Sequence, residues 1–244
     1  MGQAHVSIAH RYCGPPTSGN GGYSAGLLAG FAPGTTQVRL LRPPPLGEPL
    51  SVEFLDDGVI TLQGRDGAVA EARPFEFELA VPPPVSFADA TAAAENYAGF
   101  RAHQYPTCFV CGPARQPGDG LCVFAGKLPG REVVAAPWRP DASLAGTGQH
   151  VRPEFIWAAL DCPGYFAVTD GQLPMLLGTL AVEIHRPVSV HQRCVVLGWH
   201  LSSEGRKHRT GTVLYDENGE PCARSLATWI ELKTQAPPAS PTTT

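Results

Sequence analysis

Short apolar runs separated by polar turns dominate the chain. Between residues 75 and 79, three apolar side chains alternate with two glutamates, in the order Phe75, Glu76, Phe77, Glu78 and Leu79. A period of two predicts a strand with one buried face and one solvated face. Many short segments of this kind, with 25 prolines and 27 glycines scattered between them, predict antiparallel sheets joined by turns.

The same order of signals occurs twice along the chain. One strand-like run ends at Arg42-Pro43 and another at Arg186-Pro187, where proline removes a backbone donor from the ladder. An apolar strand follows each run, over residues 50–55 and 194–201, and then come a polar turn and another strand. We interpret the two segments as copies of one structural unit.

Each copy closes with a hairpin signal and a last strand. The turns contain Asp66-Gly67 and Asn218-Gly219, pairs that accept the positive φ angles of a tight hairpin. We expect the last strand of the first copy to reach residues 75–79 and that of the second copy to cover residues 226–232.

One short helical segment precedes each set of strands. The first runs from Gly21 to Gly30, and the second runs from Pro153 to about Cys162, with proline at a favoured first position. Both segments carry almost no charge, so an apolar surface must surround each of them.

A single helix wrapped by a curled antiparallel sheet satisfies this requirement. Two such sheets placed edge to edge would cover each other's edge strands. The alanine-rich stretch from Val81 to about Gln104 is the expected connector, and residues 235–244 are expected to form a disordered tail.

Composition narrows the classes of function and location. The 244 residues, 43% of them hydrophobic, suffice for two small domains. The net charge of −4, with no long basic run, argues against a nucleic-acid partner. Residues 1–12 do not resemble a signal peptide, and no run approaches the roughly 20 apolar residues of a membrane span, so we expect a cytoplasmic protein without a membrane partner. The seven cysteines have no framework spacing and are expected to be reduced.

Several motifs are similar to those of one known superfamily. Cys108-Phe109-Val110-Cys111-Gly112-Pro113 is followed by Asp119-Gly120-Leu121, and a second motif runs from Trp157 to Gly164. These motifs resemble the opening and the central helix of hot-dog fold thioesterase-like domains, and residues 205–219 resemble their last two strands. In the first half, Gly19-Asn20-Gly21-Gly22-Tyr23 occupies the place of the His-Gly-Gly motif of phenylacetate-pathway-type acyl-CoA thioesterases.

The resemblance implies an α+β protein with a tandem, or double, hot-dog fold, in which each curled antiparallel sheet wraps around a central helix. We place an N-terminal hot-dog domain at residues 1–96, a C-terminal hot-dog domain at residues 97–234 and the tail at residues 235–244. The resemblance also implies an acyl-CoA thioesterase, which is a thioester hydrolase.

The start of the first helix is the candidate oxyanion site. Asn20, Gly21 and Gly22 lie where unpaired backbone N–H groups and the positive end of the helix dipole stabilise a developing oxyanion. The alternative is structural: Asn20 caps the helix, and the glycines let its backbone pack closely against a strand.

Asp161 is the candidate base or nucleophile. A carboxylate in an apolar helix is costly to bury, and burial raises its pKa toward the range that suits a general base. The alternative is that its side chain caps the kink at Pro163-Gly164 or meets an arginine.

In the resembled family, the acid lies nine residues after the first residue of the motif. Nine residues before Asp161 is Arg152, followed by Pro153 in place of a glycine, and nine residues after Asn20 is Ala29. Each half therefore keeps one half of the catalytic set. The resemblance then implies one composite site where the two halves meet and a second, inactive site.

Further residues are candidates for substrate binding. Aromatic side chains on the two helices would line an apolar tunnel or belong to the core. A polar loop before the second helix would position water, and a basic hairpin would hold phosphates or form a solvated turn. These candidates are Tyr23, Trp157, Gln149, His150, Arg206, Lys207 and Arg209.

Cys108 and Cys111 form a C-x-x-C pair. With Cys122 or a histidine the pair would bind zinc, but no second pair occurs at the expected spacing. We therefore favour a turn at Gly112-Pro113 with packed thiols. We expect no metal, and no cofactor other than the coenzyme A that belongs to the substrate.

Three functions remain open. The first is hydrolysis of an acyl-CoA or acyl-carrier thioester at the composite site. The second is non-catalytic binding of the same partners. The third is a hot-dog hydratase or dehydratase, which requires a catalytic histidine that the Asp161 segment lacks. Homo-oligomer formation is also left open.

Overall fold

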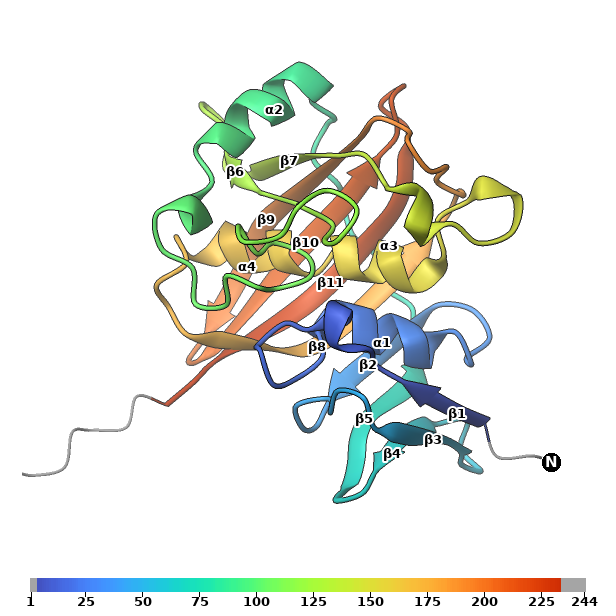
Figure 1. The fold of residues 1–244 in the computed structure, drawn as a ribbon. Coiled ribbons are helices and arrows are strands. Elements are labelled where there is room, and N and C mark those ends of the chain that lie inside the picture. Colours follow the sequence, from blue (N-terminus) through green and yellow to red (C-terminus); the bar gives the residue numbers. More distant parts are fainter. Residues whose placement is uncertain (1–3, 234–244) are drawn as a thin grey trace, which may run out of the picture.

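One open antiparallel sheet forms the framework of the protein. The computed structural model describes residues 4–233, and its sheet has eleven strands in the order β1-β3-β4-β5-β2-β8-β11-β10-β9-β7-β6 (Figure 1). The strands are β1 (Ala4–Ser7), β2 (Thr36–Leu40), β3 (Pro49–Phe54), β4 (Ile60–Gly64), β5 (Gly67–Pro74), β6 (Gly126–Lys127), β7 (Val134–Trp138), β8 (Met175–Ile184), β9 (Cys194–Glu204), β10 (Lys207–Tyr215) and β11 (Pro221–Glu231).

The helices are short, and the first begins where the sequence predicts. The side chain of Asn20 accepts a hydrogen bond from the Tyr23 N–H at 2.8 Å, which satisfies a donor that the helix leaves unpaired. The described helices are α1 (Gly21–Ala29), α2 (Phe87–Glu95), α3 (Pro153–Ala159) and α4 (Cys162–Val168), with 3-10 turns at His10–Tyr12, Ala98–Phe100, Ala142–Leu144 and Thr147–Gln149.

Two units of helix and sheet lie next to each other in the molecule. Helix α1 packs on β2, β4 and β5, and helix α4 packs on β7, β9 and β10 (Figure 1). In each unit a helical segment is followed by four antiparallel strands, β2 to β5 in the first and β8 to β11 in the second. The predicted internal repeat is therefore confirmed.

The two units join through strands β2 and β8. These strands pair antiparallel, with Val38 opposite Leu180, and both side chains are fully buried. Each strand thus satisfies the backbone groups that would otherwise be exposed at the edge of its partner unit. This arrangement confirms the predicted edge-to-edge contact of the two sheets.

The second central helix is broken rather than ended near Cys162. Helix α3 ends at Ala159, and α4 begins at Cys162 and continues to Val168. Pro163 has no N–H to donate to the carbonyl four residues earlier, so the chain starts a new helix there. The carbonyl of Leu160, inside the break, accepts a hydrogen bond from Thr212 Oγ1 at 2.8 Å.

Glycines allow α1 and α3 to approach closely. A Cβ atom at Gly22 would lie 2.6 Å from the Cβ of Asp161, and one at Gly26 would lie 2.7 Å from the Cα of Glu154. Only a residue without a Cβ fits at such a contact. Gly21 instead faces Leu40 of β2 and Leu177 of β8, so these glycines pack against a helix as well as against strands.

The prediction that the last strand of the first copy reaches residues 75–79 is wrong. Strand β5 ends at Pro74, because its neighbour β2 begins at Thr36, the partner of Pro74. Beyond Pro74, residues 75–79 have no neighbouring strand among the described residues with which to pair. The segment keeps its alternation, since Phe75, Phe77 and Leu79 are half-buried, but it lies outside the sheet and Arg224 stacks over Phe77 at 5.5 Å.

The connector contains a helix that the alanine-rich pattern did not predict. Helix α2 packs against β6, β7 and β9, where Ala90 and Ala93 join a cluster with Val195, Leu197 and Val213. This cluster is separate from the main core. Helix α2 thus contacts strands of the second unit, although it lies before the domain boundary placed at residue 96. That boundary stays a prediction.

Three strands near the two edges of the sheet were not expected from the sequence. Strand β1 pairs with β3 at one end of the sheet, and β6 and β7 extend the other end beyond β9. The tail predicted for residues 235–244 lies outside the described residues. Within residues 4–233, no helix has both the length and the apolar character to cross a membrane.

Candidate active site

A mostly apolar cavity of about 480 Å³ lies where the two units meet. Its walls come from the loop before α1, the ends of β2, β8 and β11, the start of α4, and the loop that follows α2. The polar, titratable and thiol residues of its wall include Thr17, Ser18, Asn20, Arg42, His103, Gln104, Tyr105, Cys108, Cys111, Asp161, Cys162 and Tyr165.

Asp161 lies in the break between α3 and α4 and faces the start of α1. Its Oδ2 atom accepts hydrogen bonds from Asn20 Nδ2 and from the N–H of Gly22, both at 2.9 Å. The side chain does not cap α4, and it forms no ion pair with any residue of the described range 4–233. The two structural alternatives considered for Asp161 therefore do not apply.

The two oxygens of Asp161 differ in their surroundings. Oδ1 is buried and has no hydrogen-bond partner in the described part of the chain, a rare state for a buried polar atom. Burial raises the pKa of Asp161 to about 7, the Gly22 N–H opposes the rise, and the neighbouring Cys108 adds to it. One oxygen is thus anchored, and the other has no partner among the described residues, on a side chain whose residue lines the cavity.

The expected oxyanion donors do not all remain free. Asn20 and Gly22 both donate to Asp161, whereas the N–H of Gly21 has no acceptor within residues 4–233. Gly21 opens α1 and lines the cavity, so its N–H lies at the positive end of the helix dipole. The roles proposed for these three residues stay predictions.

Three thiol groups lie next to Asp161. Cys108, Cys111 and Cys162 are buried, and their sulfur atoms all lie within 4.8 Å of one another. Hydrogen bonds from Cys111 and Cys162 hold the pKa of Cys108 well below its usual value. The turn expected at Gly112-Pro113 is present, with the Gly112 N–H donating to the Cys108 carbonyl at 2.9 Å.

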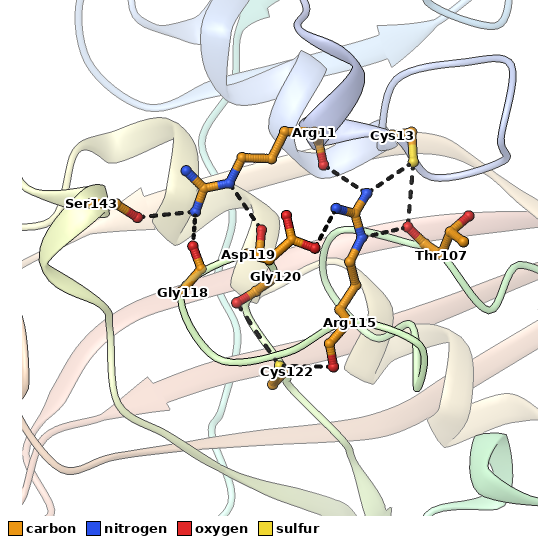
Figure 2. Close-up of polar contacts among 9 residues, drawn as sticks. All are labelled: Arg11, Cys13, Thr107, Arg115, Gly118, Asp119, Gly120, Cys122 and Ser143. Atoms are coloured by element: carbon orange, nitrogen blue, oxygen red, sulfur yellow. Dashed lines mark hydrogen bonds and ion pairs between the residues drawn. The ribbon is translucent and has the colours of Figure 1, made fainter.

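Two arginines fasten the loop that carries the C-x-x-C pair to the first unit (Figure 2). Arg115 Nη2 donates to the carbonyl of Arg11 at 2.9 Å, and its Nε donates to the carbonyl of Thr107 at 2.9 Å. Arg11 in turn donates to the carbonyls of Gly118 and Asp119. Cys122, considered as a third ligand, instead contacts backbone carbonyls of this loop (Figure 2).

Tyr23 and Trp157, proposed as substrate contacts, belong to the core. Tyr23 stacks on Tyr12 with ring centroids 4.2 Å apart and also contacts Phe155. Trp157 is buried against α1 at Gly26. Neither side chain lines the cavity, because each points from its helix toward the α1–α3 contact.

The polar and basic candidates also lie away from the cavity wall. Gln149 and His150 are exposed in the loop before α3, and Arg206, Lys207 and Arg209 are exposed at the β9–β10 hairpin. Arg206 comes nearest, since its Nη1 donates to the carbonyl of Glu231, between the lining residues Ile230 and Leu232. Substrate binding by these residues stays a prediction.

Sequence reasoning missed several residues of the cavity wall. Arg42 follows β2, His103 lies in the loop after α2, and Cys162 opens α4. Arg42 belongs to the Arg-Pro signal that marked the repeat, so its position at a strand end was visible, but its side of the sheet was not. His103 and Cys162 carried no local signal of this kind.

The equivalent position in the other half lacks the same groups. Arg152 precedes α3, and its guanidinium lies 4.7 Å from the ring centre of Phe155. Ala29 ends α1 and offers no carboxylate. The acid and the glycine pair therefore come together at one of the two helix starts.

Three solved structures that span both units share this architecture. A putative thioesterase II from Thermobifida fusca has 14% identity over 96% of this chain and 93% of that chain, with a TM-score of 0.59. The TesB protein of Mycobacterium avium subspecies paratuberculosis has 15% identity over 95% and 93% of the two chains, with a TM-score of 0.58. A hot-dog protein of unknown function from Alicyclobacillus acidocaldarius has 11% identity over 96% and 94%, with a TM-score of 0.55.

These likenesses show the fold. The chain has the tandem hot-dog architecture that its motifs implied, with one helix-and-sheet unit in each half. No protein-family model matches the chain, and no curated protein matches it.

Proposed function

We propose that the protein hydrolyses an acyl thioester in the cavity between its two hot-dog units. One observation carries the proposal: Asn20 and Gly22 of the first unit hold Oδ2 of Asp161 from the second unit, while Oδ1 stays unpartnered. The solved protein from Thermobifida fusca with this fold is named a putative thioesterase II, which supports the reaction class.

Asp161 acts as the general base in this proposal. Oδ1 removes a proton from a water molecule in the cavity, and the water oxygen forms a bond to the thioester carbonyl carbon. When the tetrahedral intermediate collapses, the carbon–sulfur bond breaks and the thiolate takes the proton from Asp161. The products are a carboxylic acid and a free thiol, and the base is restored.

The start of α1 stabilises the oxygen that becomes negatively charged. Gly21 opens a nine-residue helix and lines the cavity, and its N–H has no acceptor among the described residues. A donor placed at such a position contributes through its partial positive charge where charge develops. Asn20 and Gly22 serve the reaction by orienting the carboxylate.

The cavity suits an apolar acyl group with an anionic carrier. Leu40, Leu177 and Ile230 line it, and a cavity of about 480 Å³ falls in the usual range for small-molecule sites. Arg42 also lines the cavity, and its guanidinium lies close to Gly67 at the start of β5. Guanidinium groups bind phosphate well, which fits either coenzyme A or a phosphopantetheine arm.

Thiol release from a panel of short, long and aromatic acyl-CoAs tests the proposal. Asp161→Asn keeps the size of the side chain but removes the base. We expect the variant to lose at least about 100-fold in kcat, since general-base catalysis contributes about 10²–10⁴-fold. A thermal melt of both proteins checks that the variant is folded.

Non-catalytic binding is the second candidate, and one observation favours it. Two of the three expected oxyanion donors, Asn20 and Gly22, are occupied by Asp161. Saturable binding of acyl-CoA without thiol release would establish this function and overturn hydrolysis. Equal release by the parent and by folded Asp161→Asn would remove Asp161 from the mechanism.

A further inference from the structure

We propose that Cys108, Cys111 and Cys162 form a binding site for Zn²⁺ in the wall of the cavity. The C-x-x-C pair comes from the loop after α2, and the third thiol comes from the first residue of α4. The fold therefore supplies the third sulfur that no nearby sequence spacing predicted. The inference does not depend on thioesterase activity.

The spacing of the sulfur atoms fits a tetrahedral metal. Zn–S bonds of about 2.3 Å at tetrahedral angles place two sulfurs about 3.8 Å apart. Cys108 Sγ and Cys162 Sγ are 3.9 Å apart, and all three sulfurs lie within 4.8 Å of one another. Three soft donors at this spacing select zinc over hard cations such as Mg²⁺ or Ca²⁺.

Neighbouring polar groups are placed to support thiolates. Asn20 Nδ2 lies 3.9 Å from Cys108 Sγ, within reach for a hydrogen bond to sulfur. His103 Nε2 lies 3.4 Å from Cys111 Sγ. Hydrogen bonds to ligand atoms orient a metal site and tune its affinity, so both residues fit a supporting role.

The hydrogen bonds of His103 assign it to that supporting role and not to direct ligation. The backbone N–H of Tyr105 donates to His103 Nδ1 at 2.9 Å, so Nδ1 carries no proton. The single ring proton then lies on Nε2, which donates it to Cys111 Sγ and cannot also bind a metal.

A three-thiolate site leaves one coordination position for a ligand from outside the chain. All three cysteines line the cavity, so this ligand comes from the cavity side. Zinc sites with three protein ligands and an exchangeable fourth ligand are typical of catalytic centres, whereas structural sites have four protein ligands. The site thus accepts water or a small thiol.

Metal analysis of purified protein is the first test. The chain is produced with zinc in the medium, reduced with a phosphine and purified without chelators. We expect about one zinc per chain, and at least about a tenfold lower content in Cys108→Ser and Cys162→Ser. Cys222→Ser is the matched control, because Cys222 is also buried but lies outside the cluster.

A zinc content no higher than that of the buffer, measured on folded parent protein whose thiols are shown to be reduced, would overturn the proposal. Equal zinc content in the parent and in both cluster variants would also overturn it. A thermal melt identifies a variant that has lost its metal only because it has unfolded.

Cobalt substitution keeps the test decisive if the cysteine variants do not fold. The parent loaded with Co²⁺ should show the intense visible bands of a tetrahedral ion and near-ultraviolet charge transfer from thiolate. Weak octahedral bands would contradict the site. Addition of ethanethiol should shift the bands, and an unchanged spectrum would contradict the open fourth position.

Discussion

Asp161 shows at the scale of one residue how the two halves share a site. Oδ2 is held by Asn20 and by the Gly22 N–H, and Oδ1 faces no protein partner within the described residues. A single carboxylate is therefore both fixed in position and left with a free lone pair. This asymmetry is what a general base requires.

Gly22→Ala tests the close approach that brings Asp161 to α1. The added methyl group would lie 2.6 Å from Asp161 Cβ and 2.8 Å from the carbonyl oxygen of Trp157. We expect a loss of about 1–3 kcal/mol in the free energy of unfolding, since overpacking costs about this much, and a loss of thioester turnover. Denaturant unfolding and the thiol-release assay measure the two effects.

Gly30→Ala is the control for that substitution. Gly30 directly follows the same helix with φ of −61°, and its nearest contact for a Cβ is the carbonyl oxygen of Leu27 at 3.4 Å. We expect stability within about 0.5 kcal/mol of the parent and unchanged turnover. If both variants behave alike, the close contact at Gly22 is not what positions Asp161.

The sequence predicted some residues of the site and not others for physical reasons. Asn20 and Asp161 were found because each stands out locally, one as a helix cap and one as a charge in an apolar helix. His103 and Cys162 were missed, because only the tertiary fold brings them to the cavity. Tyr23 lies in the core, an outcome that the sequence left open because an aromatic side chain on a buried helix fits a core or a tunnel equally well.

The break between α3 and α4 is the feature that matters at the scale of elements. It turns the chain so that Asp161 points to α1, and the Leu160 carbonyl that it frees accepts from Thr212 Oγ1 at 2.8 Å. Strand β10 thus replaces a hydrogen bond that the helix cannot make.

Thr212→Val should destabilise the protein. Valine keeps the shape of threonine but removes the hydroxyl that donates to the buried Leu160 carbonyl at 2.8 Å, which leaves only the longer bond from Ser225 Oγ at 3.5 Å. We expect a loss of about 1–3 kcal/mol in the free energy of unfolding, with lower turnover as Asp161 shifts. Urea unfolding monitored by tryptophan fluorescence measures the loss.

Thr210→Val on the same strand is the matched control. Thr210 is as fully buried as Thr212, but its Oγ1 has no hydrogen-bond partner among the described residues. Valine should therefore be neutral or stabilising there by up to about 1 kcal/mol. A similar loss in both variants would mean that strand packing, and not the bond to Leu160, supports the break.

Element boundaries show where sequence patterns stop being sufficient. The start of α1 was predictable from Asn20, because a cap acts within one turn. Residues 75–79 alternate like a strand, yet a strand also needs a neighbour, and β2 begins opposite Pro74. Whether a partner extends that far is a property of the whole sheet.

At the scale of the molecule, we expect the continuous sheet to make the two units unfold as one cooperative unit. Strands β2 and β8 pair through the centre, and the main core includes residues of both units. Leu180→Ala should remove about 2–5 kcal/mol from the free energy of unfolding. Amide exchange in β4 and in β10 should then accelerate together, as mass spectrometry of backbone exchange can measure.

Ile184→Ala, near the end of the same strand, provides the comparison. Ile184 is 39% exposed, so its truncation should cost less than about 1 kcal/mol. Acceleration confined to one unit in Leu180→Ala would contradict the single cooperative unit. The repeat itself was readable from the sequence, but the strands that extend both edges and helix α2 were not, since none of them is repeated.

Single-turnover hydrolysis in oxygen-18 water tests the central claim most directly. The acyl-CoA that reacts fastest in the panel is mixed with excess protein, and mass spectrometry locates the label in the released acid and in the Asp161 peptide. The account predicts label in the acid alone, because water attacks the thioester directly. Absence of labelled acid, or label in Asp161 after turnover, would contradict hydrolysis by water that Asp161 activates.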